Sequence, residues 1–175
     1  MNKMDLADRI EHCAFMGREF LLYLWWKSEA ADGKFALPGF GEITLSLEAS
    51  MVLERKVDVV ERTRLTGPAP STGKTAKEAL RHGELPTRCT IRITHEERDY
   101  AFALGDDLVL RTVKLPALLT DAEDETLLER MSLAKSLETM LDALFVAMLR
   151  ARLSPTFRTE TLPALRRFAQ EGAAA

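Results

Sequence analysis

Residues 15–26 (FMGREFLLYLWW) form a segment whose side chains are apolar nearly all the way round a helix, and it ends in Trp25 and Trp26. Neighbouring residues of a helix project about 100° apart, so two adjacent tryptophans cannot share one narrow stripe. Such a helix must be covered on more than one side. Four of its aromatic side chains are therefore predicted to lie in the core or at an interface: Phe20, Tyr23, Trp25 and Trp26.

The rest of the chain changes from strand-like to helical patterning at Pro116. The aromatic helix is predicted over about residues 5–30, because Gly33 follows it as a stop signal. Apolar and polar residues alternate in short runs over residues 43–115, separated by turn-forming residues. This pattern predicts meander strands and hairpins, interrupted by a short helix over residues 74–82.

A long helix is predicted over residues 121–153, which contain neither proline nor glycine. Acidic residues cluster at its start, where they suit the positive end of the helix dipole, and Thr120 is positioned to cap it. A shorter helix is predicted over about residues 162–169. The long helix is expected to present an apolar face made of Leu127, Met131, Leu137, Leu141, Leu144, Phe145, Met148 and Leu149.

These elements predict one α+β domain over residues 1–170 and a flexible tail at residues 171–175. An antiparallel sheet of about six strands is expected to pack against the N-terminal aromatic helix and the long C-terminal helix. A chain of 175 residues that is 46% hydrophobic can bury a sizeable core, and its length fits one domain better than two.

Charge and cysteine content narrow the functional classes. The formal net charge of -3 gives no overall attraction to nucleic acid or to an acidic membrane, so a polyanion site has to be a local patch. Cys13 and Cys89 are too few for a disulfide framework, which favours a reducing cytoplasm. The sequence has no apolar run long enough for a signal peptide or a membrane span.

The loop at residues 67–75 (GPAPSTGKT) is the strongest catalytic motif, because it follows a strand-like run and opens a helix as a phosphate-binding loop does. However, its glycines are separated by five residues where that loop has four, and Pro68 and Pro70 lack the backbone N–H groups that hold phosphates. Nucleotide hydrolysis is therefore disfavoured.

A metal-dependent nuclease is the second catalytic alternative, since Glu54-Arg55-Lys56 places a carboxylate and an amine on one face of a strand, with Glu42 on an earlier strand. Spacing assigns no further carboxylate to hold Mg²⁺. His12, His82 and His95 are scattered and form no spaced metal set with the cysteines. We therefore predict no catalytic residue, no metal and no cofactor.

Basic residues suggest a weak phosphate-binding pattern. Two pairs lie on predicted strands and one pair lies at helical spacing on the short middle helix: Arg88 and Arg92, Arg111 and Lys114, and Lys74 and Lys77. Spacing alone favours a solvated sheet face balanced by acidic residues over a DNA-binding surface.

Four segments, in matching order, resemble the C-terminal part of RdgC-like recombination-associated proteins: GREFLLYLWW at 17–26, EALRHG at 78–83, VKLP at 113–116 and the closing helix at 144–153. The resemblance implies a nucleoid-associated protein that binds double-stranded DNA with little sequence preference, forms a ring-like dimer and restrains recombinase loading. It implies no chemical step and no cofactor. The family's long N-terminal region, which helps to close the ring, has no counterpart here.

Two functions follow as expectations. The first is a non-enzymatic, DNA-associated accessory protein in the cytoplasm that modulates recombination through sequence-independent duplex binding. The alternative is a homo-oligomeric or partner-binding assembly module that has lost DNA binding and uses the Trp25-Trp26 helix or the long C-terminal helix. The resemblance favours the first, whereas the acidic net charge favours the second.

Overall fold

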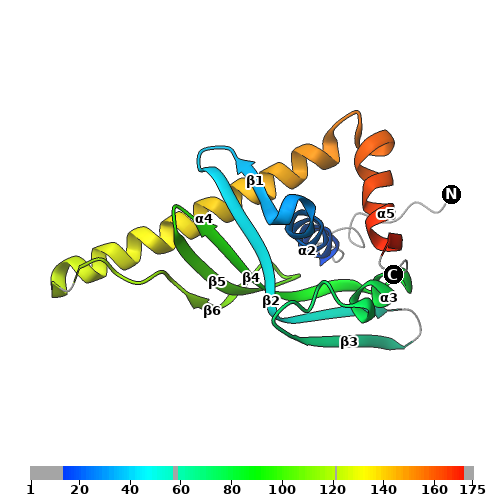
Figure 1. The fold of residues 1–175 in the computed structure, drawn as a ribbon, viewed down its shortest axis with the longest axis horizontal. Helices are drawn as coiled ribbons and strands as arrows, with labels where there is room; N and C mark the ends of the chain where they lie inside the picture. The colour runs from blue at the N-terminus through cyan, green and yellow to red at the C-terminus, as the bar shows by residue number, and fades with distance from the viewer. Residues whose placement is uncertain (1–13, 57–58, 121, 172–175) are drawn as a thin grey trace.

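The computed structural model describes residues 14–56, 59–120 and 122–171, and these residues form a six-stranded antiparallel sheet with helices on one side (Figure 1). The expected α+β architecture is confirmed. In chain order the elements are α2 (Ala14–Glu29), η1 (Ala30–Gly33), β1 (Lys34–Leu37), β2 (Gly41–Lys56), β3 (Val60–Gly67), α3 (Lys74–Arg81), β4 (Leu85–His95), β5 (Arg98–Gly105), β6 (Leu110–Lys114), α4 (Glu123–Leu153), η2 (Phe157–Thr161) and α5 (Leu162–Glu171).

The long strand β2 organises the sheet. On one side it pairs with β4, and on its other side it pairs first with β1 and then with β3. The register shifts between Glu48 and Met51, and Ala49 there has a φ of 56°. This β-bulge bends the strand, which allows two successive partners on one side. Strands β5 and β6 extend the sheet beyond β4.

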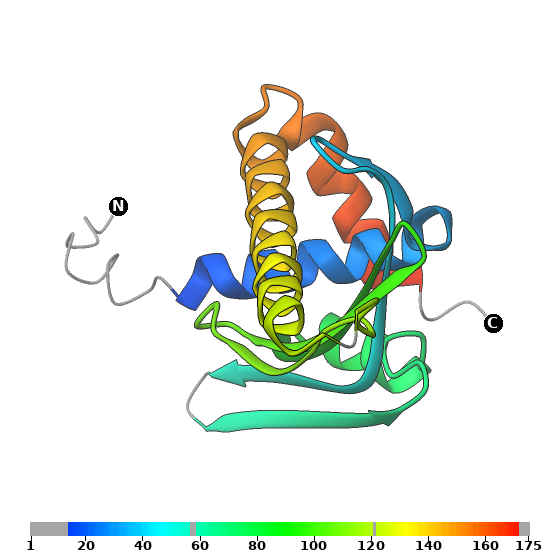
Figure 2. The ribbon, with the colours of Figure 1, turned by 90° about the vertical axis from the view of Figure 1, so that its left-hand side faces the viewer.

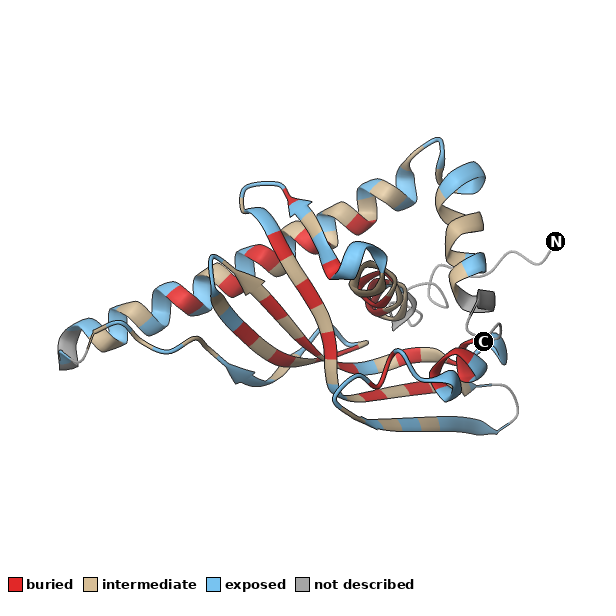
Figure 3. Cartoon of the chain, viewed as in Figure 1, coloured by how far each residue is buried: buried red, intermediate tan, exposed pale blue. Residues whose placement is uncertain are grey.

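Alternation along the strands separates the two faces of the sheet. Leu47, Ile91 and Phe102 pair in register across β2, β4 and β5, and all three are buried. Figure 3 shows this alternation as buried bands along the strands. The buried face packs against α2, so the apolar residues of the meander strands and of the aromatic helix form one core.

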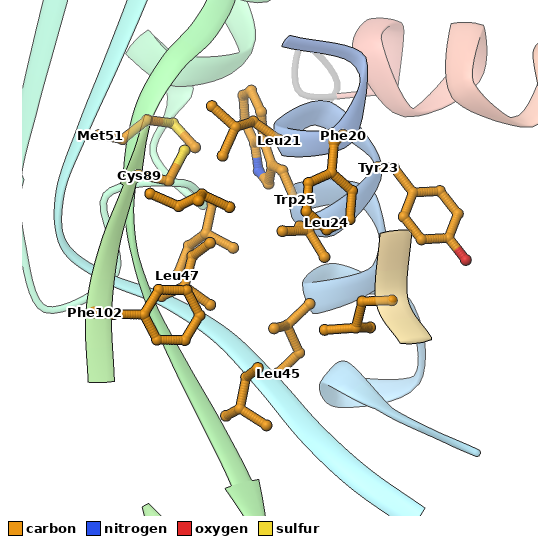
Figure 4. Close-up of a cluster of buried hydrophobic side chains, with 14 of the residues drawn as sticks. Phe20, Leu21, Tyr23, Leu24, Trp25, Leu45, Leu47, Met51, Cys89 and Phe102 are labelled. Carbon is orange, nitrogen blue, oxygen red and sulfur yellow. The ribbon is translucent and has the colours of Figure 1, made fainter. Parts of the chain in front are cut away.

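Helix α2 lies in the centre of that core, as its sequence predicts. Phe20, Tyr23 and Trp25 are buried, and Trp26 is half-buried against the core. Figure 4 shows Leu21, Leu24 and Trp25 among the side chains that face the sheet residues Met51 and Cys89. Helix α2 ends at Glu29 and is followed by η1, in which Ala31 and Asp32 adopt positive φ angles before Gly33. The predicted start near residue 5 lies outside the described residues.

Helix α4 crosses α2 and extends past the sheet at its N-terminal end (Figures 1 and 2). The buried residues along it recur every three or four positions: Leu133, Leu137, Met140, Leu144 and Met148. Phe145 is half-buried and meets Phe20 edge to face, with 5.2 Å between ring centroids. This contact joins the long C-terminal helix to the aromatic helix.

Two details predicted for α4 are wrong. Ala122 occupies the N-cap position, and the Thr120 hydroxyl instead accepts from the Ala122 N–H before the helix begins. Leu127 and Met131 were expected on the buried face, but both are exposed because this end of α4 extends past the sheet.

Candidate nucleic-acid interface

The face of the sheet opposite α2 is polar and open. It carries the residues that alternate with the buried ones, and the helices of the described chain gather on the other side (Figure 2). A sheet covered on one face only is typical of antiparallel architecture, and its free face is available to a macromolecular partner. We call this polar surface of β2 to β6 the open face.

The structure brings four of the predicted basic residues to the open face. Arg92 pairs with Ala101, and Ala101 pairs with Lys114, which places Arg92 and Lys114 in one row across three strands. Arg111 pairs with Ala103 and shares the same side. Arg88 lies on β4 beside Arg92, with Thr90 between them in the same alternation.

Two of these four residues are held by carboxylates. The Arg92 guanidinium donates to Glu48 and to Asp99, each at 2.9 Å, and the Glu48 hydrogen bond is the main reason that the pKa of Arg92 is raised. Arg111 pairs with Asp107, and its hydrogen bonds lower the pKa of Asp107 to about 2. Part of the positive charge predicted from sequence is therefore balanced within the chain.

Arg88 and Arg64 form the least balanced part of the open face. Val52 of β2 pairs with Arg64 of β3 on one side and with Arg88 of β4 on the other, so the two arginines flank it in one row. Both side chains are exposed, and neither has an ion pair or hydrogen bond to another described residue. Two guanidinium groups in this arrangement can donate to the oxygens of a phosphate.

A hollow of about 350 Å³ lies around this pair, lined also by the polar side chains of Ser50, Thr87, Arg62, Glu54 and Asp106. Its acidic groups are already engaged: Arg62 donates to Glu54 at 2.6 Å, and Arg18 donates to Asp106 at 2.9 Å. The unengaged charge in the hollow is therefore positive. We call Arg64, Arg88 and this hollow the arginine pair site.

Arg64 was not predicted from the sequence. Its alternation with Arg62 and Thr66 on the strand-like run before Gly67 indicates a polar face. That pattern does not show that this run pairs with β2. The pairing places Arg64 and Arg88 on either side of Val52.

The two lysines predicted on the middle helix do not join this surface. Lys77 is only 6% exposed, because its ammonium group donates to Glu29 at 2.7 Å and lies 3.2 Å from the ring centroid of Phe168. Its prediction as a DNA contact is therefore corrected to a buried ion pair between α3 and α2. Lys74 is exposed at the start of α3, which lies on the helical side of the sheet.

The residues considered for a nuclease lie apart from one another. Glu54 pairs with Arg62 near the end of β2, and Glu42 lies at the beginning of that strand. Across the ranges that the structure describes, no group of three or more His, Cys, Asp or Glu side chains is arranged to hold a metal ion.

Neither the models of known families nor the curated proteins give a match to this sequence. Within residues 14–56, 59–120 and 122–171, no helix combines the length and apolar character needed to span a bilayer.

Proposed function

We propose that the chain is a non-enzymatic DNA-associated accessory protein that contacts the phosphate backbone of duplex DNA through its open face. The observation that carries this proposal is the arginine pair site, where Arg64 and Arg88 flank Val52 on the open face without a carboxylate partner among the described residues. Backbone contacts of this kind position a protein on DNA without reading its sequence. The resemblance to recombination-associated proteins supports a role in modulating recombination.

The other basic residues of the open face extend this contact unequally. Lys114 is exposed and makes no ion pair with the described residues, so its ammonium group adds a further contact. Arg92 and Arg111 retain their carboxylate partners, and each phosphate they approach also meets a negative charge. With a net charge of -3, long-range attraction to DNA is weak, and binding depends on this local patch.

Replacing Arg64 and Arg88 together by alanine is expected to weaken duplex binding and its dependence on salt. Each lost phosphate contact makes the negative slope of log K against log salt shallower by about 0.9. The slope of the double variant should therefore be shallower by roughly 1.8. Fluorescence anisotropy with a labelled duplex at several salt concentrations measures both quantities. Two duplexes of unrelated sequence should give the same result.

The matched control replaces Arg150 and Arg158 by alanine, because both are exposed on the helical side and the change in net charge is identical. This control should leave the affinity and the slope near those of the unaltered chain. Equal losses in the two double variants would show that binding follows net charge, and the open face would then not be the interface.

An assembly module is the second candidate, and it rests on one apolar surface. Leu119, Leu127, Leu128 and Met131 are 79%, 63%, 67% and 61% exposed around the N-terminal end of α4. Exposed apolar groups of this size mark association sites when they are contiguous. We call these four residues the α4 tip. Helix α2 is a weaker candidate for association, because its aromatic side chains are largely covered by the chain itself.

If the α4 tip mediates self-association, replacing Leu127 and Met131 by glutamate should return the chain to its monomer mass of 19.6 kDa. Light scattering over a range of concentrations measures the mass, and the melting temperature should hardly change because both side chains are exposed. The control is Leu153→Glu, which adds a single glutamate at the other end of α4, where the side chain is 81% exposed. A chain that is monomeric before any substitution excludes this interface.

A further inference from the structure

An apolar hollow of about 260 Å³ lies on the helical side of the molecule, away from the open face. It is lined by side chains from α2, the last turns of α4, η2 and α5, among them Leu22, Met148, Ala151, Leu162 and Leu165. Its volume is slightly below that of pockets that hold drug-sized molecules. The walls therefore suit a small apolar body, such as a chain of several methylene groups.

The rim of this hollow carries hydrogen-bond donors. Arg166 is exposed there and makes no ion pair or hydrogen bond with another described residue. Arg152 lies 3.4 Å from Glu19, and its guanidinium carbon lies 4.5 Å from the ring centroid of Phe157. The one acidic side chain among the lining residues is thus already beside a cation.

Tyr23 completes the polar side of the site. Its ring is buried, and its hydroxyl points away from the apolar cluster that faces the sheet (Figure 4). A tyrosine hydroxyl is protonated near neutral pH and can donate, and burial raises the pKa of Tyr23 further. No described residue makes a hydrogen bond to that hydroxyl. A ligand head group that accepts hydrogen bonds and is negatively charged matches these groups.

We infer that this hollow binds a small amphipathic carboxylate, with its aliphatic tail between α2, α4 and α5 and its carboxylate at Arg166 and Tyr23. Apolar walls with a few polar groups give such a site both affinity and orientation. A phosphate of the DNA backbone has no apolar group to occupy the hollow. A cationic amphiphile would be repelled by Arg152 and Arg166. The inference is independent of the proposed DNA interface.

Octanoate is the test ligand, and isothermal titration calorimetry with the full chain is the measurement. Octanoate should bind at one site per chain, and hexanoate should bind about 15-fold more weakly, because each buried methylene contributes about fourfold. Heptanol and heptyltrimethylammonium carry the same seven-carbon tail as octanoate with no charge or the opposite charge, and both should bind at least tenfold more weakly. Equal binding of all three compounds would overturn the assignment.

Arg166→Ala should weaken octanoate binding by tenfold or more, since a charge-assisted hydrogen bond is lost. Its control is Arg167→Ala, because the neighbouring Arg167 lines a different hollow with Trp26 and Ala164. Melting temperatures with and without octanoate give a second readout in case a variant folds poorly. No uptake of octanoate by the unaltered chain overturns the inference, as does uptake that Arg166→Ala leaves unchanged.

Discussion

Replacing Trp25 by alanine is expected to lower the free energy of unfolding by about 3–5 kcal/mol, the usual cost of removing a large buried aromatic side chain. Trp25 is fully buried, and its indole N–H donates to Glu29. Its ring also meets Phe168 of α5 edge to face, with 5.4 Å between centroids. The substitution therefore removes a contact between α2 and α5, and chemical denaturation monitored by circular dichroism measures the loss.

Trp26→Ala is the matched control, since it removes the same side chain at the next position of the helix. Trp26 is only half-buried and packs on Tyr23 and Lys27 at the edge of the core. We expect it to cost markedly less than Trp25→Ala, because less apolar surface leaves water when the chain folds. Equal costs for the two variants would contradict the placement of Trp25 in the core.

The fold was predictable because its signals are local. Alternation along β4 places Cys89, Ile91 and Ile93 on one face whatever the neighbouring strand is. The nearly continuous apolar surface of residues 15–26 likewise requires burial on several sides before any partner is known. The first inference uses the two-residue repeat of a strand and the second uses the 3.6-residue turn of a helix. Neither requires knowledge of which strands pair or in what register.

The candidate site was predictable only in part, because its electrostatics depend on pairs that are distant in the sequence. Arg92 and Glu48 meet only through the register of β2 with β4. Lys77 and Glu29 meet only after α3 packs on α2, and that contact converts a predicted DNA contact into a buried ion pair. Residue types and spacing identify candidate cations, whereas strand order decides which of them remain unpaired.

The α4 tip shows a related limit of periodicity. Leu127 and Met131 continue the spacing of the apolar face, but the sheet does not reach them, so they are exposed. Helical periodicity indicates which face of a helix is apolar, but it does not indicate how far along the helix a covering layer extends. The length of helix that is covered therefore decides whether an apolar residue of α4 lies in the core or on an exposed surface.

Gly17→Ala is expected to destabilise the chain by about 3 kcal/mol, although the same change in an exposed helix stabilises by about 1 kcal/mol. A Cβ at Gly17 would lie 1.8 Å from the backbone oxygen of Asp106, in the turn that follows β5. That turn is held in place, because the Asp106 N–H donates to Thr87 and the Asp106 carboxylate pairs with Arg18. Helix α2 would have to move away from the sheet, which opens the core around Leu21 and Trp25.

Gly73→Ala is the control for Gly17→Ala, because a Cβ there would lie 3.8 Å from its nearest neighbour, an ordinary contact distance. The changes in melting temperature caused by the two substitutions should have opposite signs or differ by several degrees, when both are measured under the same conditions. A stabilised Gly17→Ala chain would mean that α2 does not contact this turn. Because Arg18 and Asp106 connect α2 to the rim of the arginine pair site, the same substitution should also reduce duplex binding. The position that allows close packing of the aromatic helix thus also supports the geometry of the open face.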